Sequence, residues 1–195
     1  MNQSLERRFL STVSGFLVSL PFDLKVLFEA KDDPDLDRKA REVACGAILY
    51  VLTPGDVAGE KNIIGFVDDV IMVRLALKAI ADAGGDGAQA FRQRFAEHYE
   101  GLDDALGCFQ QFLGPELYGW LAGKVVSLPR LAYRNKRVPA YLDDVENADD
   151  LYEQGLTFQT DYEITEQVLA DKFKQVRPVV EHLQKRKTDE ARKIS

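Results

Sequence analysis

The residues best placed to do chemistry are three aspartates beside the turn between two apolar helical segments. Asp56 lies in the turn, and Asp68 and Asp69 stand together where the second segment begins. Carboxylate oxygens are preferred ligands of hard cations such as Mg²⁺ and Ca²⁺, so a cation site is one hypothesis. The spacing matches no EF-hand loop, and carboxylates in such positions also accept backbone N–H groups. We expect the three aspartates to shape the backbone, with the cation site as the alternative.

Familiar catalytic arrangements are missing from the sequence. There is no His-Glu-x-x-His zinc motif, no phosphate-binding loop and no Gly-x-Ser-x-Gly elbow. A di-iron site needs glutamates at positions that Phe95 and Val179 occupy. Cys45 and Cys108 lie among apolar residues without an adjacent histidine, which predicts inert core thiols. We expect both histidines at the surface or at a helix end, and no catalytic residue, bound metal or cofactor.

The elements that must position the aspartates are helices. Apolar residues recur every three or four positions over 34–52, which predicts an amphipathic helix, and the strongly apolar run over 66–83 predicts a second helix. The first is expected to start with Asp33 as its cap and Pro34 in its first turn. Further helices are predicted at 5–20, 21–30, 88–99, 102–113, 115–126 and 165–184, with one strand-like run at 156–164. The fold class is therefore all-α: a multi-helix globular bundle with a helical hairpin at its centre.

The turn of this hairpin carries a recognisable order of residues. A helix ends in Tyr-x-x-x-Pro-x-Asp, and Gly-x-x-Asp-Asp then opens the next helix. The residues are Tyr50, Pro54, Asp56, Gly65, Asp68 and Asp69. Over about residues 38–80 the chain resembles the YkvA-like family, a bacterial domain family of unknown function. The resemblance implies a helical hairpin and no particular reaction.

The physical roles of these residues follow from helix geometry. Adjacent helical residues point about 100° apart, so Asp68 and Asp69 cannot both face one neighbour. We expect one of them to cap the helix and the other to contact Tyr50, a basic side chain or an ion. Gly65 is expected to supply a backbone conformation that is closed to other residues.

Composition and charge limit the domain organisation and the class of protein. The chain has 195 residues with 46% hydrophobic and 29% charged, which is typical of one soluble globular unit. A net charge of −7 argues against nucleic-acid binding. Residues 138–171 contain ten carboxylates and no Lys or Arg, whereas residues 172–195 are basic. We predict a helical domain at 1–137, an extended acidic connecting segment at 138–171, and a basic C-terminal helix and tail at 172–195.

The uneven charge suggests how the protein works. The acidic segment, through Asp143, Asp144, Asp149 and Asp150, offers a docking surface for a basic partner, and it also offers an intramolecular partner for the basic cluster before it. That cluster contains Arg130, Arg134 and Arg137. Our hypothesis is a non-enzymatic adaptor or regulator that binds an unidentified protein, with the oligomeric state left open. The alternatives are a cation-binding or metal-dependent protein that uses Asp56, Asp68 and Asp69, and a protein peripherally and weakly associated with a membrane.

The sequence also favours a location in the cytoplasm. The most apolar stretch, Val13 to Leu20, is far shorter than the roughly 20 residues that cross a bilayer. No cleavage site for export follows it. Two cysteines among apolar residues fit a reducing compartment.

Overall fold

The computed structural model describes residues 3–53 and 63–194, so the predictions for Pro54 and Asp56 lie outside the described residues. Its helices are α1 (Gln3–Asp32), α2 (Arg38–Leu52), α3 (Val67–Asp82), α4 (Gly85–Arg94), α5 (Ala96–Tyr99), α6 (Leu102–Lys124), α7 (Val138–Asp143), α8 (Val145–Asp161), α9 (Glu166–Lys172) and α10 (Arg177–Ile194). Two 3₁₀ turns, η1 (Ile63–Phe66) and η2 (Val125–Arg130), and a hairpin of β1 (Ala132–Tyr133) with β2 (Lys136–Arg137) complete it. The predicted all-α class is confirmed.

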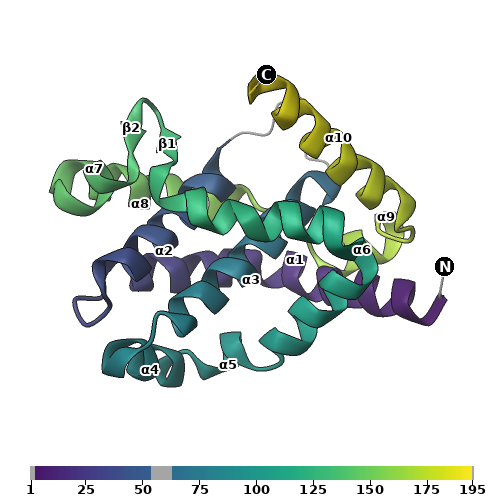
Figure 1. Ribbon diagram of the computed structural model, residues 1–195, viewed down its shortest axis with the longest axis horizontal. Coiled ribbons are helices and arrows are strands. Elements are labelled where there is room, and N and C mark those ends of the chain that lie inside the picture. The colour runs from purple at the N-terminus through teal and green to yellow at the C-terminus, as the bar shows by residue number, and fades with distance from the viewer. Residues whose placement is uncertain (1–2, 54–62, 195) are drawn as a thin grey trace.

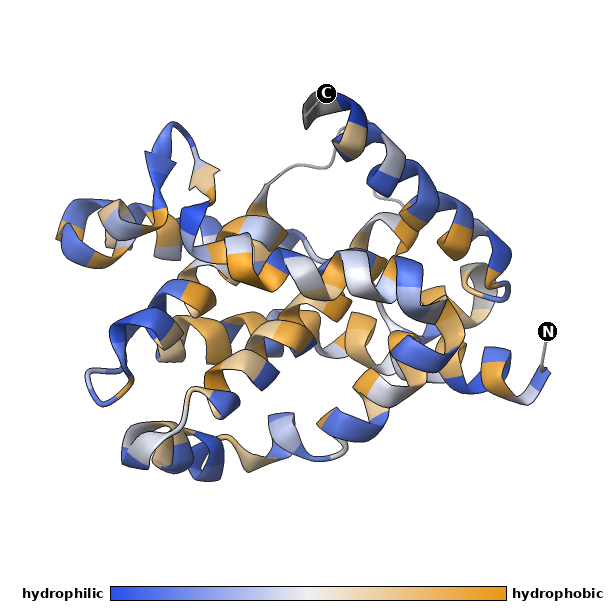
Figure 2. Ribbon diagram, viewed as in Figure 1, coloured by the Kyte–Doolittle hydropathy of each residue, from blue (hydrophilic) through white to orange (hydrophobic). Residues whose placement is uncertain are grey.

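Helix α1 is the centre of the bundle, with α2, α3 and α6 packed around it (Figure 1). Its inward residues, including Phe9, Leu17 and Leu24, are fully buried, and the apolar stretches of the neighbouring helices converge on the same interior (Figure 2). Among the described helices, only α1 is long and apolar enough to cross a membrane by length and composition, a test that core helices also pass. The hairpin of α2 and α3 is thus part of a shared core.

Helix α1 runs unbroken through Pro21, so the prediction of two helices joined there is wrong. A proline inside a helix has no N–H to donate to the carbonyl four residues earlier, which here belongs to Leu17. That carbonyl instead accepts a hydrogen bond from the Tyr162 hydroxyl at 2.6 Å. The Pro21 carbonyl accepts a further one from Gln159 Nε2 at 3.3 Å. The helix continues because another segment of the chain satisfies its backbone.

Helix α2 starts later than predicted, because a different aspartate caps it. Asp37 accepts the backbone N–H of Ala40 at 2.6 Å, whereas Asp33 accepts that of Asp35 at 2.9 Å. Residues 33–37 therefore form a turn, and Pro34 lies in that turn and not in the helix. Asp and Asn are favoured both in turns and as caps, so the sequence alone does not separate the two positions.

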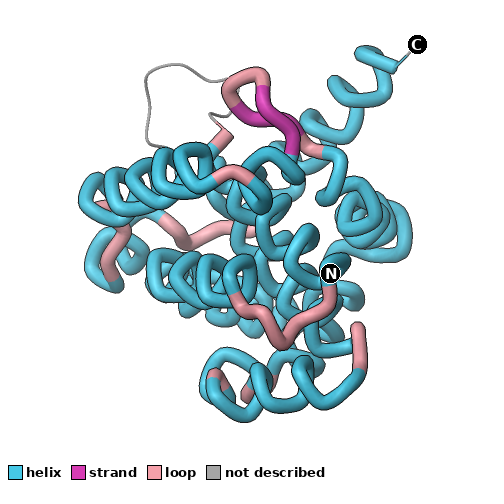
Figure 3. The backbone as a smooth tube through the Cα atoms, turned by 90° about the vertical axis from the view of Figure 1, so that its left-hand side faces the viewer, coloured by secondary structure: helices cyan, strands magenta, loops and turns pink. Residues whose placement is uncertain are grey.

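The acidic segment is not extended, and the strand-like run at 156–164 is helical as far as Asp161. Residues 138–171 fold as α7, α8 and most of α9, and α8 packs against α1 and α2 (Figure 1). Figure 3 shows how much of the described chain is helix, with one short pair of strands. Gly155 permits this contact, since a Cβ there would lie 2.5 Å from the ring of Phe28. The single helix predicted at 165–184 is in fact α9 and α10, with residues 173–176 between them.

We predict that Gly46→Ala destabilises the fold by about 1–3 kcal/mol, the usual range for overpacking. A Cβ at this buried position in α2 would lie 2.2 Å from the backbone oxygen of Leu128, which cannot move aside like a side chain. The control is Gly15→Ala in α1, where nothing lies within 4 Å and alanine is the better helix former. Urea unfolding should show a lower midpoint for the first variant and an equal or higher one for the second. Equal midpoints for both would contradict the packing of η2 on α2.

Candidate functional site

Two buried polar clusters are the candidate sites. The Asp68 cluster lies where the α2–α3 hairpin meets α10, and it contains Tyr50, Asp68, Asp69, His182 and Arg186. The Asp23 cluster lies between α1, α3 and α5, and it contains Ser19, Asp23, Arg74 and His98. Only the first includes residues that the sequence singled out.

Asp68 sits in the first turn of α3 and is fully buried. Its Oδ2 accepts a hydrogen bond from the Tyr50 hydroxyl at 2.7 Å and another from Arg186 Nη1 at 2.5 Å. Its Oδ1 lies 3.5 Å from Nε2 of His182. Neither Asp68 Oδ1 nor His182 Nε2 has a hydrogen-bond partner among the described residues. The carboxylate of Asp68 thus joins three helices, and its Oδ1 makes no hydrogen bond with a described residue.

Of the two adjacent aspartates, Asp68 is therefore the one that contacts Tyr50, and the basic side chain of Arg186 contacts the same carboxylate. The expected capping role is not what Asp68 does here, because its polar contacts go to side chains on α2 and α10. The residue before α3, Phe66, makes no side-chain capping bond in the described part of the chain. Gly65 has no left-handed φ and has room for a Cβ, so the role predicted for it is wrong.

The two adjacent carboxyls respond differently to burial. Burial alone would raise the pKa of Asp68, but His182, Arg186 and Tyr50 outweigh it and hold that pKa below its usual value. Burial, together with the negative charge of Asp68, raises the pKa of Asp69 well above its usual value, against the opposing charge of Arg186. Two carboxylates this close favour one charge between them. Asp68 is the charged member.

The described residues contain no group of three His, Cys, Asp or Glu side chains arranged to hold a metal ion. Asp56, the third aspartate of the cation hypothesis, lies outside them. Asp68 already has a cation beside it, because the guanidinium of Arg186 reaches it from α10. The charge balance of this cluster is met by the chain itself.

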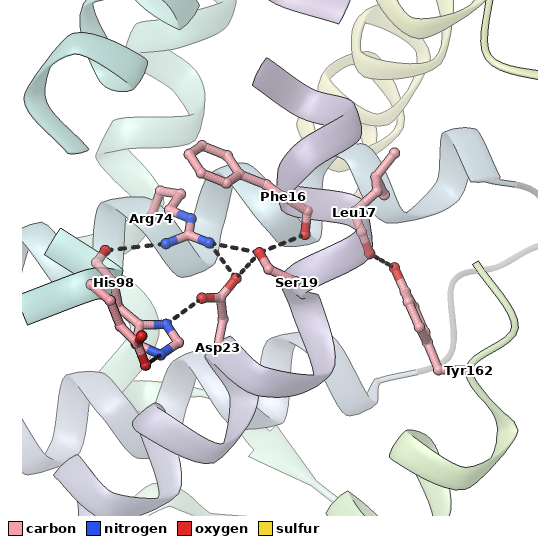
Figure 4. Close-up of polar contacts among 8 residues, drawn as sticks. Phe16, Leu17, Ser19, Asp23, Arg74, His98 and Tyr162 are labelled. Carbon is pink, nitrogen blue, oxygen red and sulfur yellow. Dashed lines mark hydrogen bonds and ion pairs between the residues drawn. The ribbon is translucent and has the colours of Figure 1, made fainter. Parts of the chain in front are cut away.

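The Asp23 cluster is an ion pair inside the core (Figure 4). Asp23 and Arg74 are 1% and 4% exposed and pair directly. Ser19 Oγ donates to Asp23 Oδ2 at 2.8 Å, and His98 Nδ1 lies 2.8 Å from Asp23 Oδ1. Arg74 also donates to the His98 carbonyl at 3.2 Å and stacks 3.8 Å from the centre of the Phe16 ring. The cluster ties α1 to α3 and α5.

The Asp23 cluster is not among the sites predicted above, although the sequence contains a signal for it. Asp23 interrupts the apolar run of Phe16–Phe28, and Arg74 interrupts that of Val70–Leu77. A charge on an apolar helical face is buried only when it is paired, so two such charges predict a partnership. His98 lies in the last turn of α5, as expected, and His182 lies within α10; both side chains are partly buried, and each lines one of the clusters.

The Asp23 cluster does not have the geometry of a Ser-His-Asp triad. In a Ser-His-Asp triad the serine hydroxyl donates a hydrogen bond to the histidine, which acts as the base. Here the Ser19 hydroxyl donates to Asp23, and His98 meets the other oxygen of that carboxylate. The arrangement neutralises a buried charge and positions helices.

The four aspartates of the acidic segment have different surroundings. Asp143 forms a two-bond ion pair with Arg38 at 2.5 and 2.8 Å, and Asp144 caps α8 by accepting the N–H of Asn147 at 2.9 Å. Asp150 lies 3.6 Å from Arg134. Asp149 is exposed and has no ion pair with a described residue.

The basic cluster is paired only in part with the acidic segment. Arg134 contacts Asp150 and donates to Gln154 at 2.7 Å. Arg130 and Arg137 are exposed, and neither forms an ion pair within the described part of the chain. The expected pairing of the basic cluster with the acidic segment is therefore found for Arg134 and not for Arg130 or Arg137, within the described residues.

Comparison with protein families, with curated proteins and with solved structures gave no match. The likeness to the YkvA-like family therefore stays a prediction. The fold and the two buried clusters define a structural class: an all-α bundle whose helices are joined by buried ionic contacts.

We predict opposite effects from changing the two adjacent carboxyls. Asp68→Asn leaves Arg186 without its carboxylate and should lower the free energy of unfolding by about 2–4 kcal/mol at pH 7. Because the pKa of Asp68 is lowered in the fold, this loss should shrink as the pH falls below 4. Asp69→Asn removes a group whose raised pKa makes its charged form unfavourable, so its stability relative to wild type should rise with pH. Thermal unfolding from pH 3 to 9 measures both, and equal behaviour of the two variants would contradict the assignment of the charge to Asp68.

For the Asp23 cluster, we predict that Asp23→Asn destabilises the protein by about 3–5 kcal/mol, because Arg74 is left charged and unpaired in the core. Ser19→Ala removes the hydrogen bonds of Ser19 Oγ with Asp23 and Arg74 but leaves these two residues paired, so it should cost less, about 1–2 kcal/mol. Chemical denaturation compares them. An Asp23→Asn variant as stable as Ser19→Ala would show that the ion pair is not a structural tie.

Proposed function

We propose that this is a non-enzymatic protein that binds another protein through the outer face of α8. The observation that carries the proposal is an exposed apolar stripe on that helix. Val145, Tyr152 and Leu156 are 75%, 53% and 44% exposed. Their spacings of seven and four residues place them on one face. The other large apolar side chains exposed in the described residues are Phe22 and Val126.

The same face of α8 is bordered by unpaired negative charge. Glu146, Asp149 and Glu153 are exposed and form no ion pair with a described residue. No Lys or Arg occurs between 138 and 171 to neutralise them. An apolar stripe with an acidic border is therefore presented to solvent.

Charge complementarity indicates the chemistry of the partner. A helix with leucine-like residues on one face and Lys or Arg beside them would cover the stripe and pair with the carboxylates, which is a common mode of helix recognition. An anionic membrane surface would instead be repelled by the acidic border. This supports a protein partner over peripheral membrane attachment.

The enzyme and cation alternatives have less support in the described residues. Asp68 is paired with Arg186, and in neither buried cluster does a described serine or cysteine donate a hydrogen bond to a histidine. Calorimetry with Mg²⁺, Ca²⁺ and Mn²⁺ tests the cation alternative directly. Saturable heat that disappears in Asp68→Asn would favour it over our proposal.

We predict that a photo-crosslinking residue at position 152 captures a protein in cells of the source organism, as one adduct of defined mass. The same residue at position 126 on η2 is the positional control, because Val126 is more exposed than Tyr152, at 76% against 53%. Glu146→Gln, Asp149→Asn and Glu153→Gln together should reduce the adduct at least tenfold, because the acidic border is removed.

The charge control changes three exposed carboxylates elsewhere: Asp86→Asn, Glu100→Gln and Asp104→Asn. It should leave the adduct intact. Equal capture at positions 152 and 126, or equal loss in the two triple variants, would contradict a specific site on α8.

A further inference from the structure

We propose that the Asp68 cluster is a guanidinium-binding site that α10 fills from within the chain, and that the arginine of a partner segment is its external ligand. The distal half of α10, residues 184–192, is then a releasable arm. This proposal concerns a different face from α8 and does not depend on the function proposed above.

The first support is the chemistry around Arg186. Its guanidinium donates to the buried carboxylate of Asp68 at 2.5 Å, and its Cζ lies 5.7 Å from the centre of the Tyr50 ring. The ring of Tyr50 also has Nζ of Lys124 5.5 Å from its centre, so the ring alone does not select a guanidinium. The contact with the buried carboxylate is what favours one, because a planar guanidinium is less strongly hydrated than an ammonium and loses less on burial. The site thus shows its ligand class through the residue that occupies it.

The second support is the way α10 is attached. Val179 and Leu183, in its proximal half, are fully buried, whereas no residue from 184 to 192 is buried. The distal half is held by polar contacts: Arg186 with Asp68, Lys187 with Glu116, and Glu190 with Lys124 and Trp120. The contacts of Lys187 and Glu190 are partly exposed ion pairs that each stabilise little, so the pair of Arg186 with the buried Asp68 is the main tie of the distal half. This half can detach, while the proximal half stays docked, when another cation takes the place of Arg186. Figure 2 shows the corresponding change from mixed to hydrophilic residues toward the C-terminus.

The third support is what detachment leaves behind. Asp68 would keep its Tyr50 hydrogen bond and lose its guanidinium, while its Oδ1 already lacks a hydrogen bond among the described residues. A buried carboxylate without a cation is unfavourable by several kcal/mol. Release of the arm is therefore coupled to entry of a replacement cation, and Arg186 competes with any external arginine.

Chemical rescue tests the site. Arg186→Ala keeps a good helix former and deletes the side chain. Ethylguanidinium, the end of an arginine side chain, should bind this variant at millimolar concentration and raise its melting temperature by several degrees. Wild type should not respond. Ethylammonium should bind at least tenfold more weakly, and the double variant Arg186→Ala with Asp68→Asn should lose the response.

The matched control is Arg177→Ala, on the same helix. Arg177 is 84% exposed and pairs only with Glu181 among the described residues, so no rescue is expected there. Trp120, the sole tryptophan, donates to Glu190 of the arm at 3.1 Å, and its fluorescence reports docking. In wild type, added salt should shift this signal before the far-ultraviolet circular dichroism changes.

Arg186→Lys, which keeps the charge, provides a second test should the alanine variant fail to fold. Its Trp120 signal should shift at lower salt than that of wild type. Three outcomes would overturn the proposal: equal rescue by ethylammonium, rescue that does not require Asp68, or a Trp120 signal in Arg186→Lys that matches wild type at every salt concentration.

Discussion

Helix packing removes several charged side chains of this protein from water, and each of them then needs a partner of opposite charge. This requirement governs the structure. The ion pair of Asp23 with Arg74 is the deepest example, because both groups lie in the core and belong to helices far apart in the chain. Removing either partner leaves a desolvated charge, so the pair restricts how α1 and α3 pack as strictly as the apolar contacts do. Ser19 and His98 complete the bonding of the carboxylate. The α1–α3 crossing therefore has one register that satisfies its charges.

The same requirement explains why the acidic segment folds onto the body. Pro21 frees the Leu17 carbonyl inside α1, and Tyr162, just after α8, supplies the missing donor. A buried carbonyl without a partner would destabilise the central helix by about 1–3 kcal/mol. A residue in the segment expected to be a connector thus supports the core helix.

The elements that were predicted well are those whose apolar residues recur over many turns. Helix α3 lies where it was predicted because its long apolar run is buried on nearly every side, as a core helix is. The start of α2 and the continuity of α1 were not predictable in this way. They depend on which of two aspartates caps a helix, and on a hydroxyl more than a hundred residues away.

The candidate site was predictable in part for the same reason. Tyr50 and Asp68 were singled out by local spacing, and their mutual contact follows from the hairpin. Arg186 was not, because local patterns say nothing about which distant cation meets a buried carboxylate. The face of α8 depends on tertiary packing as well, since its buried side is defined by α1 and Phe28.

The two buried ion pairs, Asp23 with Arg74 and Asp68 with Arg186, differ in how easily the arginine can leave its carboxylate. Arg74 arises from a helix that is buried along its length, so its departure from Asp23 would require opening the core. Arg186 lies in the distal half of α10, where no residue from 184 to 192 is buried, and its contacts with Asp68 and neighbouring groups are mainly polar. Because local opening is least costly where few apolar contacts are broken, we expect opening at Arg186 to cost less than opening at Arg74. The fold keeps one tie fixed inside the bundle and leaves the other at an edge, where a competing cation can reach it.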